Sequence, residues 1–564
     1  MAGSSGSGGT SGGGVSGAHV APSSTTGGMA ASGGSSPQAE SSGGASSAFA
    51  TGGATAVPPD PICGDGKVMG LEECDDGNQR NDDECTNQCR RAACLDGFVQ
   101  AGVEACDDGN RDDRDDCTNA CKLAVCGDGI LHAGREECDD ANTRDDDACV
   151  GDCRQATCGD GFLWADKEQC DAGTGEDGFG CTADCRPTPV ELALGDYHTC
   201  TRFSDGRVQC WGDNSRFQLG VETPASVGTQ ASELLGNLHT VVDDATAIAA
   251  RGYHTCALRQ SGKVVCWGDN SFGQLGYALP LTNFRAVEVT LSGPATAICA
   301  SEGSGYALLG DGTVSGWGYD YRDTVIDAHT APFSEPVAKL ACGKQMLCAL
   351  LASGAIECWG QGPEAAAPDE PMRINLEPLA RPWEELVAGY DFACVRSSGS
   401  VRCWGNGSYG QFLDGGGYTR RGDAVNSWVA ARTGQLSATQ LAASGSVVCA
   451  IGRTGDEGQG AKCWGFDARS GALGQPELTA GTRRDLGDDL DEVGTYLPLI
   501  DLGSGLEPQV IATSTYHTCA IFTDGRMKCW GYNELGQLGV GRDDWALGDE
   551  IGEMGDALPF VLVE

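Results

Sequence analysis

Cysteine is the residue type whose number and spacing first suggest chemistry in this chain. There are 30 cysteines among 564 residues, far more than a protein of the reducing cytosol carries unless they bind metal. Zinc sites would need Cys-x-x-Cys pairs or Cys/His clusters, but the sequence has neither, and it contains 7 histidines. We therefore expect disulfide bonds and an oxidising compartment.

The stretch "YHTCALRQSGKVVCWGDNSFGQLG", residues 253–276, indicates how one set of cysteines pairs. Two apolar runs flank a Gln-Ser-Gly turn, which predicts a β-hairpin whose last loop residue, a glycine, has positive φ. Opposed residues in such a hairpin lie about 4.5–5.5 Å apart, within reach of a disulfide. The predicted pairs are Cys200–Cys210, Cys256–Cys266, Cys348–Cys358, Cys394–Cys403, Cys449–Cys463 and Cys519–Cys529.

This hairpin block recurs along residues 190–564, and the elements that carry it predict an all-β, seven-bladed propeller. Repeats of 42 to 70 residues, each with several short strands, are typical of propeller blades. We expect the two ends of the array, "PVELAL" and "PFVLVE", to complete one blade together. A Trp-Gly pair marks each repeat, at Trp211, Trp267, Trp317, Trp359, Trp404, Trp464 and Trp530.

The third repeat and two further cysteines extend the disulfide hypothesis. In "YALLGDGTVSGWG" both hairpin cysteines are replaced at once, by Tyr306 and Gly316, as expected of a bonded pair. Cys299 and Cys342 lie at almost the same position of repeats three and four. We predict a bond between neighbouring blades; two free buried thiols are the alternative.

The block in residues 253–276 resembles the RCC1 repeat (regulator of chromosome condensation), a family of seven-bladed propellers. The glycines, the Trp-Gly pair and the Asn-x-x-Gly-Gln-Leu-Gly tail all match, best in repeats one, two and seven, whereas repeats three to six lose the tail. The resemblance implies the fold. The family includes exchange factors for small GTPases and secreted propellers that bind other proteins, so it implies function only weakly.

A second array occupies residues 61–187. Its cysteines repeat as C-x10/11-C-x10-C-x3-C, which predicts small modules held by two disulfides each because they are too small to bury a core. We expect the last two cysteines, four apart on a helical turn, not to bond to each other; the other two pairings stay open. The modules span residues 63–89, 94–121, 126–153 and 158–185.

Acidic loops lie between the second and third cysteines of each module. Clustered carboxylates could bind calcium, the one ion that the sequence suggests, although the spacing is not that of an EF-hand. A solvated acidic surface is the alternative, and the fourth loop has few carboxylates. The candidate ligands are Asp75, Asp76, Asp82, Asp83, Asp107, Asp108, Asp115, Asp116, Asp139, Asp140, Asp145 and Asp146.

The segment "CGDGILHAGREECDDANTRDDDACVGDC", residues 126–153, resembles the Myxococcus cysteine-rich repeat family. The resemblance covers all four modules. It implies an exported bacterial protein in which the array acts as a spacer or surface element, and it implies no catalytic activity.

Composition and charge further restrict the compartment of the protein and the partners it can have. Residues 1–60 are mostly Gly, Ser, Ala and Thr and predict a disordered tether. The net charge of −43 makes nucleic acid an unfavourable partner, and no apolar run is long enough to span a membrane. The sequence begins without a basic or apolar leader. We therefore expect that the true start lies upstream of Met1 and carries an export signal, for which a lipoprotein-type signal would suit the tether; reduced cysteines are the alternative.

These observations predict an exported or cell-surface, monomeric, non-enzymatic binding protein. An exchange factor for a small GTPase and a secreted hydrolase or lyase using the propeller funnel are the alternatives. No catalytic motif is present, and the repeated His198, His254 and His517 are interpreted as packing residues. The longest insertions predict a partner-binding rim formed by the acidic run 484–496 together with Tyr418, Arg420, Arg421 and Trp428.

Overall fold

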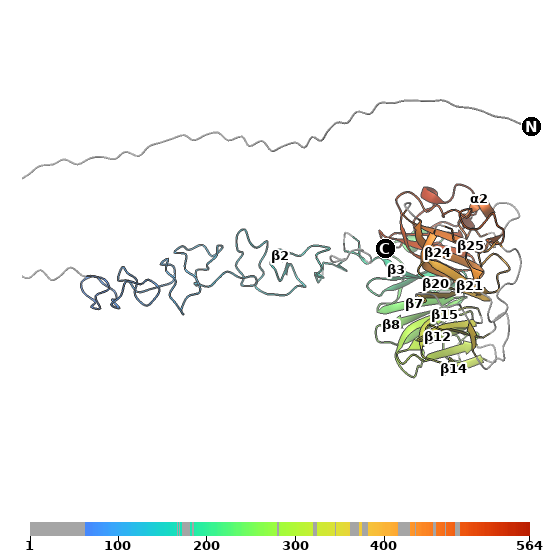
Figure 1. Ribbon diagram of the computed structural model, residues 1–564, viewed down its shortest axis with the longest axis horizontal. Helices are drawn as coiled ribbons and strands as arrows, with labels where there is room; N and C mark the ends of the chain where they lie inside the picture. The colour runs from blue at the N-terminus through green and yellow to red at the C-terminus, as the bar shows by residue number, and fades with distance from the viewer. Residues whose placement is uncertain are drawn as a thin grey trace, which may run out of the picture.

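The structure is a computed structural model in which an extended array leads to a propeller (Figure 1). It describes residues 62–563 with gaps at 166, 169, 172–180, 183–184, 279–280, 320–323, 345, 361–370, 375–381, 416–428, 432, 435, 455–457, 468–469 and 480–484. None of the helices in these described residues is long and apolar enough to cross a membrane.

Residues 62–187 contain little regular structure, and disulfides hold each module together. The first cysteine bonds to the fourth and the second to the third, which settles the pairing that the spacing left open. The expected helical turn before the fourth cysteine is wrong: Cys89 has a left-handed φ of 54°, and its N–H donates to Thr86 O in a tight turn. The bonds are Cys63–Cys89, Cys74–Cys85, Cys94–Cys121, Cys106–Cys117, Cys126–Cys153, Cys138–Cys149, Cys158–Cys185 and Cys170–Cys181.

Successive modules are linked by a repeated backbone hydrogen bond. The N–H of Ala101 donates to Asp82 O, that of Ala133 to Arg114 O, and that of Ala165 to Asp146 O. Each acceptor lies in the acidic loop of the preceding module, so these loops help to set the direction of the array. The only strands of the array in the described residues are β1 (Cys149–Val150) and β2 (Arg154–Gln155).

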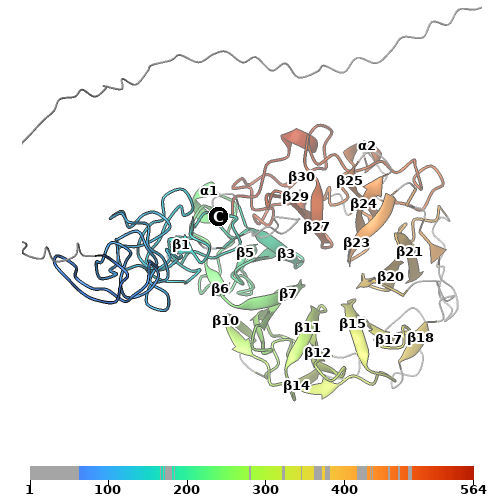
Figure 2. The same cartoon turned by 60° about the vertical axis from the view of Figure 1, so that its left-hand side comes forward.

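The propeller consists of seven four-stranded antiparallel sheets with the strands in sequence order (Figure 2). Blade one consists of β3 (Pro189–Leu194), β4 (His198–Phe203), β5 (Val208–Gly212) and β6 (Thr240–Val242), and blade two of β7 (Ala245–Arg251), β8 (His254–Arg259), β9 (Val264–Asp269) and β10 (Thr282–Glu288). Blade three consists of β11 (Ala295–Ala300), β12 (Ser304–Leu309), β13 (Val314–Tyr319) and β14 (Thr324–Thr330), and blade four of β15 (Val337–Cys342), β16 (Met346–Leu351), β17 (Ile356–Gly360) and β18 (Met372–Ile374).

Blades five to seven follow the same plan, and the inner strands of all seven blades pack side by side around the axis. Two short helices, α1 (Ala231–Leu234) and α2 (Pro476–Thr479), and a 3-10 turn at Gly555–Ala557 lie in connections. Blade five consists of β19 (Glu385–Ala388), β20 (Phe392–Ser397), β21 (Ser400–Gly405) and β22 (Val429–Ala430), and blade six of β23 (Leu436–Ser444), β24 (Val447–Thr454), β25 (Gln459–Phe466) and β26 (Asp485–Leu486). Blade seven consists of β27 (Pro508–Thr513), β28 (His517–Phe522), β29 (Met527–Tyr532) and β30 (Ala546–Leu547).

The predicted hairpin disulfides all form, with paired Cα atoms 4.0–4.1 Å apart. This short separation is typical of pairs without direct backbone hydrogen bonds. In blade three Tyr306 lies opposite Gly316, as the joint replacement predicted. Cys299 and Cys342 join the inner strands β11 and β15 of neighbouring blades. The structure contains no free cysteine.

The expected shared closing blade is wrong. β3 belongs to blade one, whereas the C-terminal segment pairs with blade seven, where Phe560 bridges Lys528 and the Val561 N–H donates to Met527 O. The inner strands β27 and β3 pack against each other instead. The ring therefore closes through the same contacts that join the other blades.

The tryptophan of the Trp-Gly pair makes a hydrogen bond between neighbouring blades in most repeats. The indole N–H donates to a backbone carbonyl in the tail of the preceding blade, which in four of the five bonds is that of a glutamine at the position of Gln274 in Gly-Gln-Leu-Gly. A repeated motif thus supplies both halves of an inter-blade hydrogen bond, at 2.9–3.1 Å. The bonds are Trp211 to Gln537, Trp267 to Gln218, Trp317 to Gln274, Trp464 to Gln411 and Trp530 to Ala472.

Candidate functional site

The two ends of the propeller axis differ because the strands within a blade are antiparallel. The β4–β5 turn and its equivalents lie at one end, where the array enters. The loops that follow the inner strands, such as Gly195–Tyr197 between β3 and β4, lie at the other end. We call this second surface the axial face; it points away from the entry of the array.

Tyrosines from several blades meet at the axial face. The ring centroid of Tyr197 lies 5.0 Å from that of Tyr516 in a stacked arrangement, and 5.9 Å from those of both Tyr253 and Tyr532. Tyr532 also contacts the edge of Trp545 at 5.8 Å. These residues come from blades one, two and seven, so one aromatic cluster spans the point where the ring closes.

A charged network continues the cluster toward blades three, four and five. Lys344 pairs with Glu302 at 2.9 Å, and the ammonium group of Lys344 lies 5.1 Å from the ring centroid of Tyr390. The Arg251 guanidinium lies over the same ring at 5.6 Å. The Tyr390 hydroxyl is 2.9 Å from that of Thr515.

Burial controls the ionisation of this network. Desolvation raises the pKa of Asp196, although the neighbouring Arg251 charge opposes the shift. Arg251 is 7% exposed, and burial lowers its pKa. Its Nη1 donates to Cys342 O at 3.4 Å, whereas its Nη2 has no partner among the described residues. The site can therefore attract a negatively charged or strongly hydrogen-bonding group.

Three large aromatic side chains of the axial face are exposed to solvent. Phe272, Tyr409 and Trp545 are 47%, 41% and 52% exposed. Phe272 packs beside the β11–β12 loop, since a Cβ at Gly303 would lie 3.3 Å from it. Tyr409 contacts Phe466 with centroids 5.0 Å apart. Aromatic residues of this kind are enriched where proteins bind each other.

The repeated histidines are buried between blades and are not part of the axial face. His198 Nε2 is 2.8 Å from Thr255 Oγ1, and His517 Nε2 is 2.8 Å from Thr199 Oγ1, so each links two blades. Burial lowers the pKa of both histidines to about 3. They stay neutral at physiological pH, and the packing role predicted for them is confirmed. His254 has no such threonine, because Gly305 occupies that position in blade three.

The rim predicted from the longest insertions falls only partly within the described residues. Tyr418, Arg420, Arg421 and Trp428 lie outside the described residues. Of the acidic run, Asp485, Asp488 and Glu492 are buried, and Glu492 accepts the backbone N–H groups of Gly487 and Asp489. Asp485 lies in the outer strand of blade six, whereas Asp489, Asp491 and Tyr496 of the same run are exposed, so the partner-binding rim stays a prediction.

The acidic loops of the array use their carboxylates internally. Both oxygens of Asp139 accept backbone N–H groups, from Gly127, Asp128, Gly129 and Ala141 at 2.7–3.2 Å. Asp75 and Asp107 occupy the same position in modules one and two and accept four N–H groups each.

Other candidate calcium ligands have protein partners as well. Asp82 and Asp146 pair with arginines two residues earlier in the sequence, at 2.6 and 2.7 Å. Asp76 and Asp108 accept the backbone N–H groups of Asn78 and Asn110, Asp83 and Asp115 accept their side-chain amides, and Asp145 accepts the Gly151 N–H. Asp116 pairs with Arg135, and Asp140 is exposed. Calcium binding stays a prediction.

Replacing Asp139 with Asn is expected to destabilise module three whether or not calcium is present, because the carboxylate holds the Cys-Gly-Asp-Gly loop. Burial alone would raise the pKa of Asp139, but the four N–H donors lower it overall. A folded-state pKa below the unfolded value of about 3.9 gives stability that is present above that pH and is lost on further acidification. Thermal unfolding with calcium or a chelator, at pH 7 and pH 3, measures both effects.

The neighbouring Asp140→Asn variant is the control, since Asp140 lies in the same loop but is exposed. Both variants should lose a calcium-induced rise in Tm if the loop binds calcium. Only the Asp139 variant should be destabilised in chelator. Equal stability of the two variants in chelator would contradict the structural role of Asp139.

Sequence reasoning missed the axial cluster. Its signal lies in two adjacent repeat positions just before each hairpin. Tyr197, Tyr253 and Tyr516 recur at the second of them, whereas the first is occupied by unlike residues, among them Asp196, Glu302, Lys344 and Tyr390. Only the ring geometry shows that these unlike residues meet.

Comparison with known proteins agrees with the geometry. The chain matches the regulator of chromosome condensation (RCC1) repeat at residues 190–218, 245–274, 384–411 and 510–537. The third of these matches lies in blade five and reaches Gln411, whose carbonyl accepts the Trp464 indole. Repeat five therefore keeps the Gly-Gln of the tail, contrary to expectation, but Phe412 and Leu413 replace its Leu-Gly. A domain of unknown function, DUF4215, matches residues 60–90.

Several human and plant proteins share part of this sequence. The probable E3 ubiquitin-protein ligase HERC3 of Homo sapiens is 28% identical over 191 residues, 31% of this chain and 18% of that protein. Human HERC4 is 32% identical over 188 residues, 31% of this chain and 17% of that protein. The mitochondrial RCC1 domain-containing protein RUG3 of Arabidopsis thaliana is 31% identical over 22% of this chain and 26% of its own length. The chain thus spans less than a fifth of the two human relatives.

Solved structures of similar shape include yeast RCC1 (Prp20) bound to Kap60, 17% identical, covering 66% of this chain and 84% of that one with a TM-score of 0.47. The CRINKLY WD40 ectodomain of the Arabidopsis thaliana receptor kinase ACR4 is 18% identical over 64% and 99% of the two chains, with a TM-score of 0.37. Neither likeness bears on what this chain binds. The chain carries RCC1 repeats that fold as a seven-bladed propeller, preceded by a disulfide-linked cysteine-rich region whose first module matches DUF4215.

Proposed function

We propose that this is an exported, non-enzymatic protein whose propeller binds a protein partner through the axial face. The observation that carries the proposal is the group of exposed aromatic side chains Phe272, Tyr409 and Trp545 around the tyrosine cluster. Water-exposed aromatic groups bury large areas at low conformational cost when a partner covers them. The array enters at the opposite end, so it would present this face outward.

The disulfides support export. All 30 cysteines are paired in 15 bonds, an arrangement typical of proteins made in oxidising compartments. Protein isolated from its natural source under denaturing, non-reducing conditions should therefore show two or fewer free thiols. A thiol count near 30 would overturn export.

Site-specific photo-crosslinking tests the binding face. A photoreactive phenylalanine analogue at Tyr409 or Trp545 should yield a discrete adduct with a protein of the native cell surface or surroundings. The same analogue at Ile551, which is 71% exposed but is not part of the aromatic cluster, serves as the matched control. Equal adducts from all three positions, or none from the axial face, would contradict the proposal.

A hydrolase or lyase is the second candidate, favoured by one observation. Burial raises the pKa of Asp196 in blade one, and the negative charge of Glu302 in blade three adds to this rise, as general-acid chemistry requires. Asp196→Asn should then abolish turnover of any substrate found without weakening the crosslinked partner. An unchanged turnover would exclude Asp196 as the acid.

A further inference from the structure

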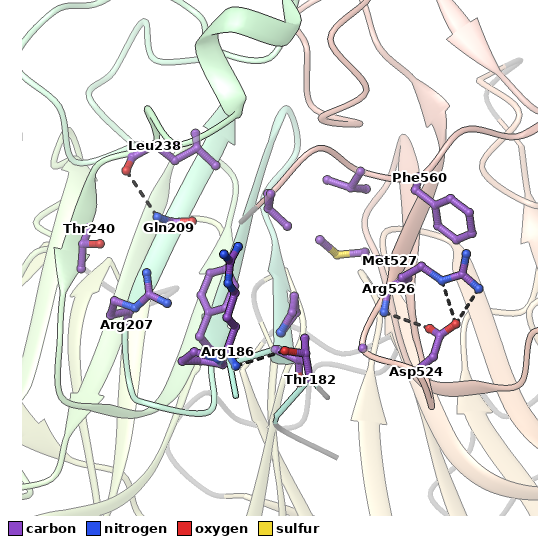
Figure 3. Close-up of a pocket in the computed structure, with 18 residues that line it drawn as sticks. Thr182, Arg186, Arg207, Gln209, Leu238, Thr240, Asp524, Arg526, Met527 and Phe560 are labelled. Carbon is purple, nitrogen blue, oxygen red and sulfur yellow. Dashed lines mark hydrogen bonds and ion pairs between the residues drawn. The ribbon is translucent and has the colours of Figure 1, made fainter. Parts of the chain in front are cut away.

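A cavity of about 620 Å³ lies where the array meets the propeller, at the end opposite the axial face. Its wall is formed by the last turn of module four, the hairpin turns of blades one and seven, and the C-terminal segment (Figure 3). Cavities of this size commonly hold small ligands or the ends of peptides.

Three arginines line the cavity in a chain whose net charge is −43. Arg207 follows the turn of blade one and Arg526 occupies the same position in blade seven. Each pairs with the aspartate two residues before it, at 2.5 and 2.6 Å. The equivalent residue is Lys263 in blade two, Thr313 in blade three and Ala355 in blade four. Arginine at this position is thus found in the two blades that border the cavity.

The third arginine, Arg186, comes from the array and lies between the other two in Figure 3. It is held in place by its neighbours, because its N–H donates to Thr182 Oγ1 and the adjacent Cys185 is bonded to Cys158. The side chain is exposed, and no carboxylate of the described residues pairs with it. Asp524 is the one acidic residue in the lining, and Asp205 pairs with Arg207 from outside the lining. The three guanidinium groups therefore exceed these two carboxylates by one, and this excess favours a carboxylate ligand.

Apart from three threonines the rest of the lining is mostly apolar, and two buried polar atoms in it, Thr188 Oγ1 and Gln209 Oε1, have no hydrogen-bond partner among the described residues. Leu238, Met527, Phe560 and Val561 supply hydrophobic surface. Gln209 is 7% exposed; its Nε2 donates to Leu238 O at 3.3 Å, and its Oε1 has no donor among the described residues. A buried acceptor without a donor is costly, so a ligand N–H near Gln209 would be stabilising.

We propose that this cavity binds the C-terminal residue of a peptide. The α-carboxylate pairs with Arg186, Arg207 and Arg526, the last amide N–H donates to Gln209 Oε1, and an apolar side chain packs on Met527 and Phe560. The three features match a carboxylate, a donor and a hydrophobic group in one residue. This site lies away from the axial face, so it does not depend on the function proposed above.

Calorimetry on the full chain with acetyl-Gly-Leu-Phe tests the proposal. The peptide with a free carboxylate should bind at least tenfold more tightly than its carboxamide. Arg207→Ala combined with Arg526→Ala, or Arg186→Ala alone, should weaken the acid at least tenfold. Lys263→Ala, at the same turn position outside the cavity, is the matched control and should bind like the parent; the Tm of each variant verifies folding.

Several outcomes would overturn the assignment. Equal binding of acid and carboxamide, or absence of binding at millimolar peptide, rules out recognition of the carboxylate. A loss in Lys263→Ala as large as in the arginine variants would show a general charge effect. Arginine-dependent binding of dodecanoate without binding of the peptide would assign the cavity to fatty acids. If an ester in place of the last amide binds equally well, Gln209 has no part in recognition.

Discussion

Mild reduction of the native protein is expected to unfold the cysteine-rich array and leave the propeller folded. Among the described residues of the array, the buried hydrophobic side chains are cysteines apart from Val150 and Ala156. Each module is closed by bonds that span 11 and 26 or 27 residues, and each such bond contributes about 2–4 kcal/mol. Without them too little surface is buried to offset the chain entropy.

The disulfides of the array should be reduced faster than the hairpin disulfides of the propeller, because they are more exposed to the reductant. In each module one cysteine of every bond is only half-buried, whereas the twelve hairpin cysteines of the propeller are at most 4% exposed. Thiol exchange requires direct approach to sulfur. Alkylation after brief treatment with dithiothreitol should label cysteines 63–185, and a protease should then cut between 62 and 187 while a propeller fragment survives. Labelling of Cys256 or Cys519 as fast as Cys74 would contradict this.

Trp267→Ala is expected to cost about 3–5 kcal/mol of unfolding free energy, the range found for large aromatic side chains in cores. Trp267 is fully buried between blades one and two, and its indole N–H donates to Gln218 O at 2.9 Å. The variant would leave a cavity at an inter-blade contact, and the Gln218 carbonyl would keep only the longer hydrogen bond from the Thr255 hydroxyl, at 3.4 Å. Urea unfolding followed by far-UV circular dichroism, without reductant, measures the change.

Two substitutions control this experiment. Trp545→Ala removes the same side chain from a position that is 52% exposed and should change stability by about 0.5 kcal/mol or less. Trp267→Phe keeps a ring in the core but loses the donor, and should fall between the two. A Trp267→Ala variant as stable as Trp545→Ala would show that the tryptophan does not hold the blades together.

Local patterns explain why so much of the fold could be predicted. A hairpin places Cys256 opposite Cys266 through the turn between them, and glycine is required at its end, where Gly262 has a φ of 77°. These constraints act within about ten residues of sequence. The bond between Cys299 and Cys342 could be predicted as well, because the repeat gives both cysteines equivalent positions in adjacent blades.

The pairing that stayed open and the prediction that was wrong both concern choices that local sequence does not constrain. Both remaining pairings of a four-cysteine module satisfy the spacing, and only the turn at Cys89 selects one of them. The closing blade likewise depends on whether residues after 558 pair with β29 or with β3, and both edges offer suitable apolar strands. Packing of Val561 beside Met527 decides in favour of blade seven.

The sequence by itself determined the repeat, the paired cysteines and the propeller, because each rests on periodic contacts between residues close along the chain. Only the tertiary structure decided where binding surfaces lie. Arg251, Glu302 and Lys344 are dissimilar residues of different repeats, and Arg186 and Arg526 are more than 300 residues apart in sequence. Closure of the ring brings each group together, and no pattern along the chain records which blades become neighbours across the axis.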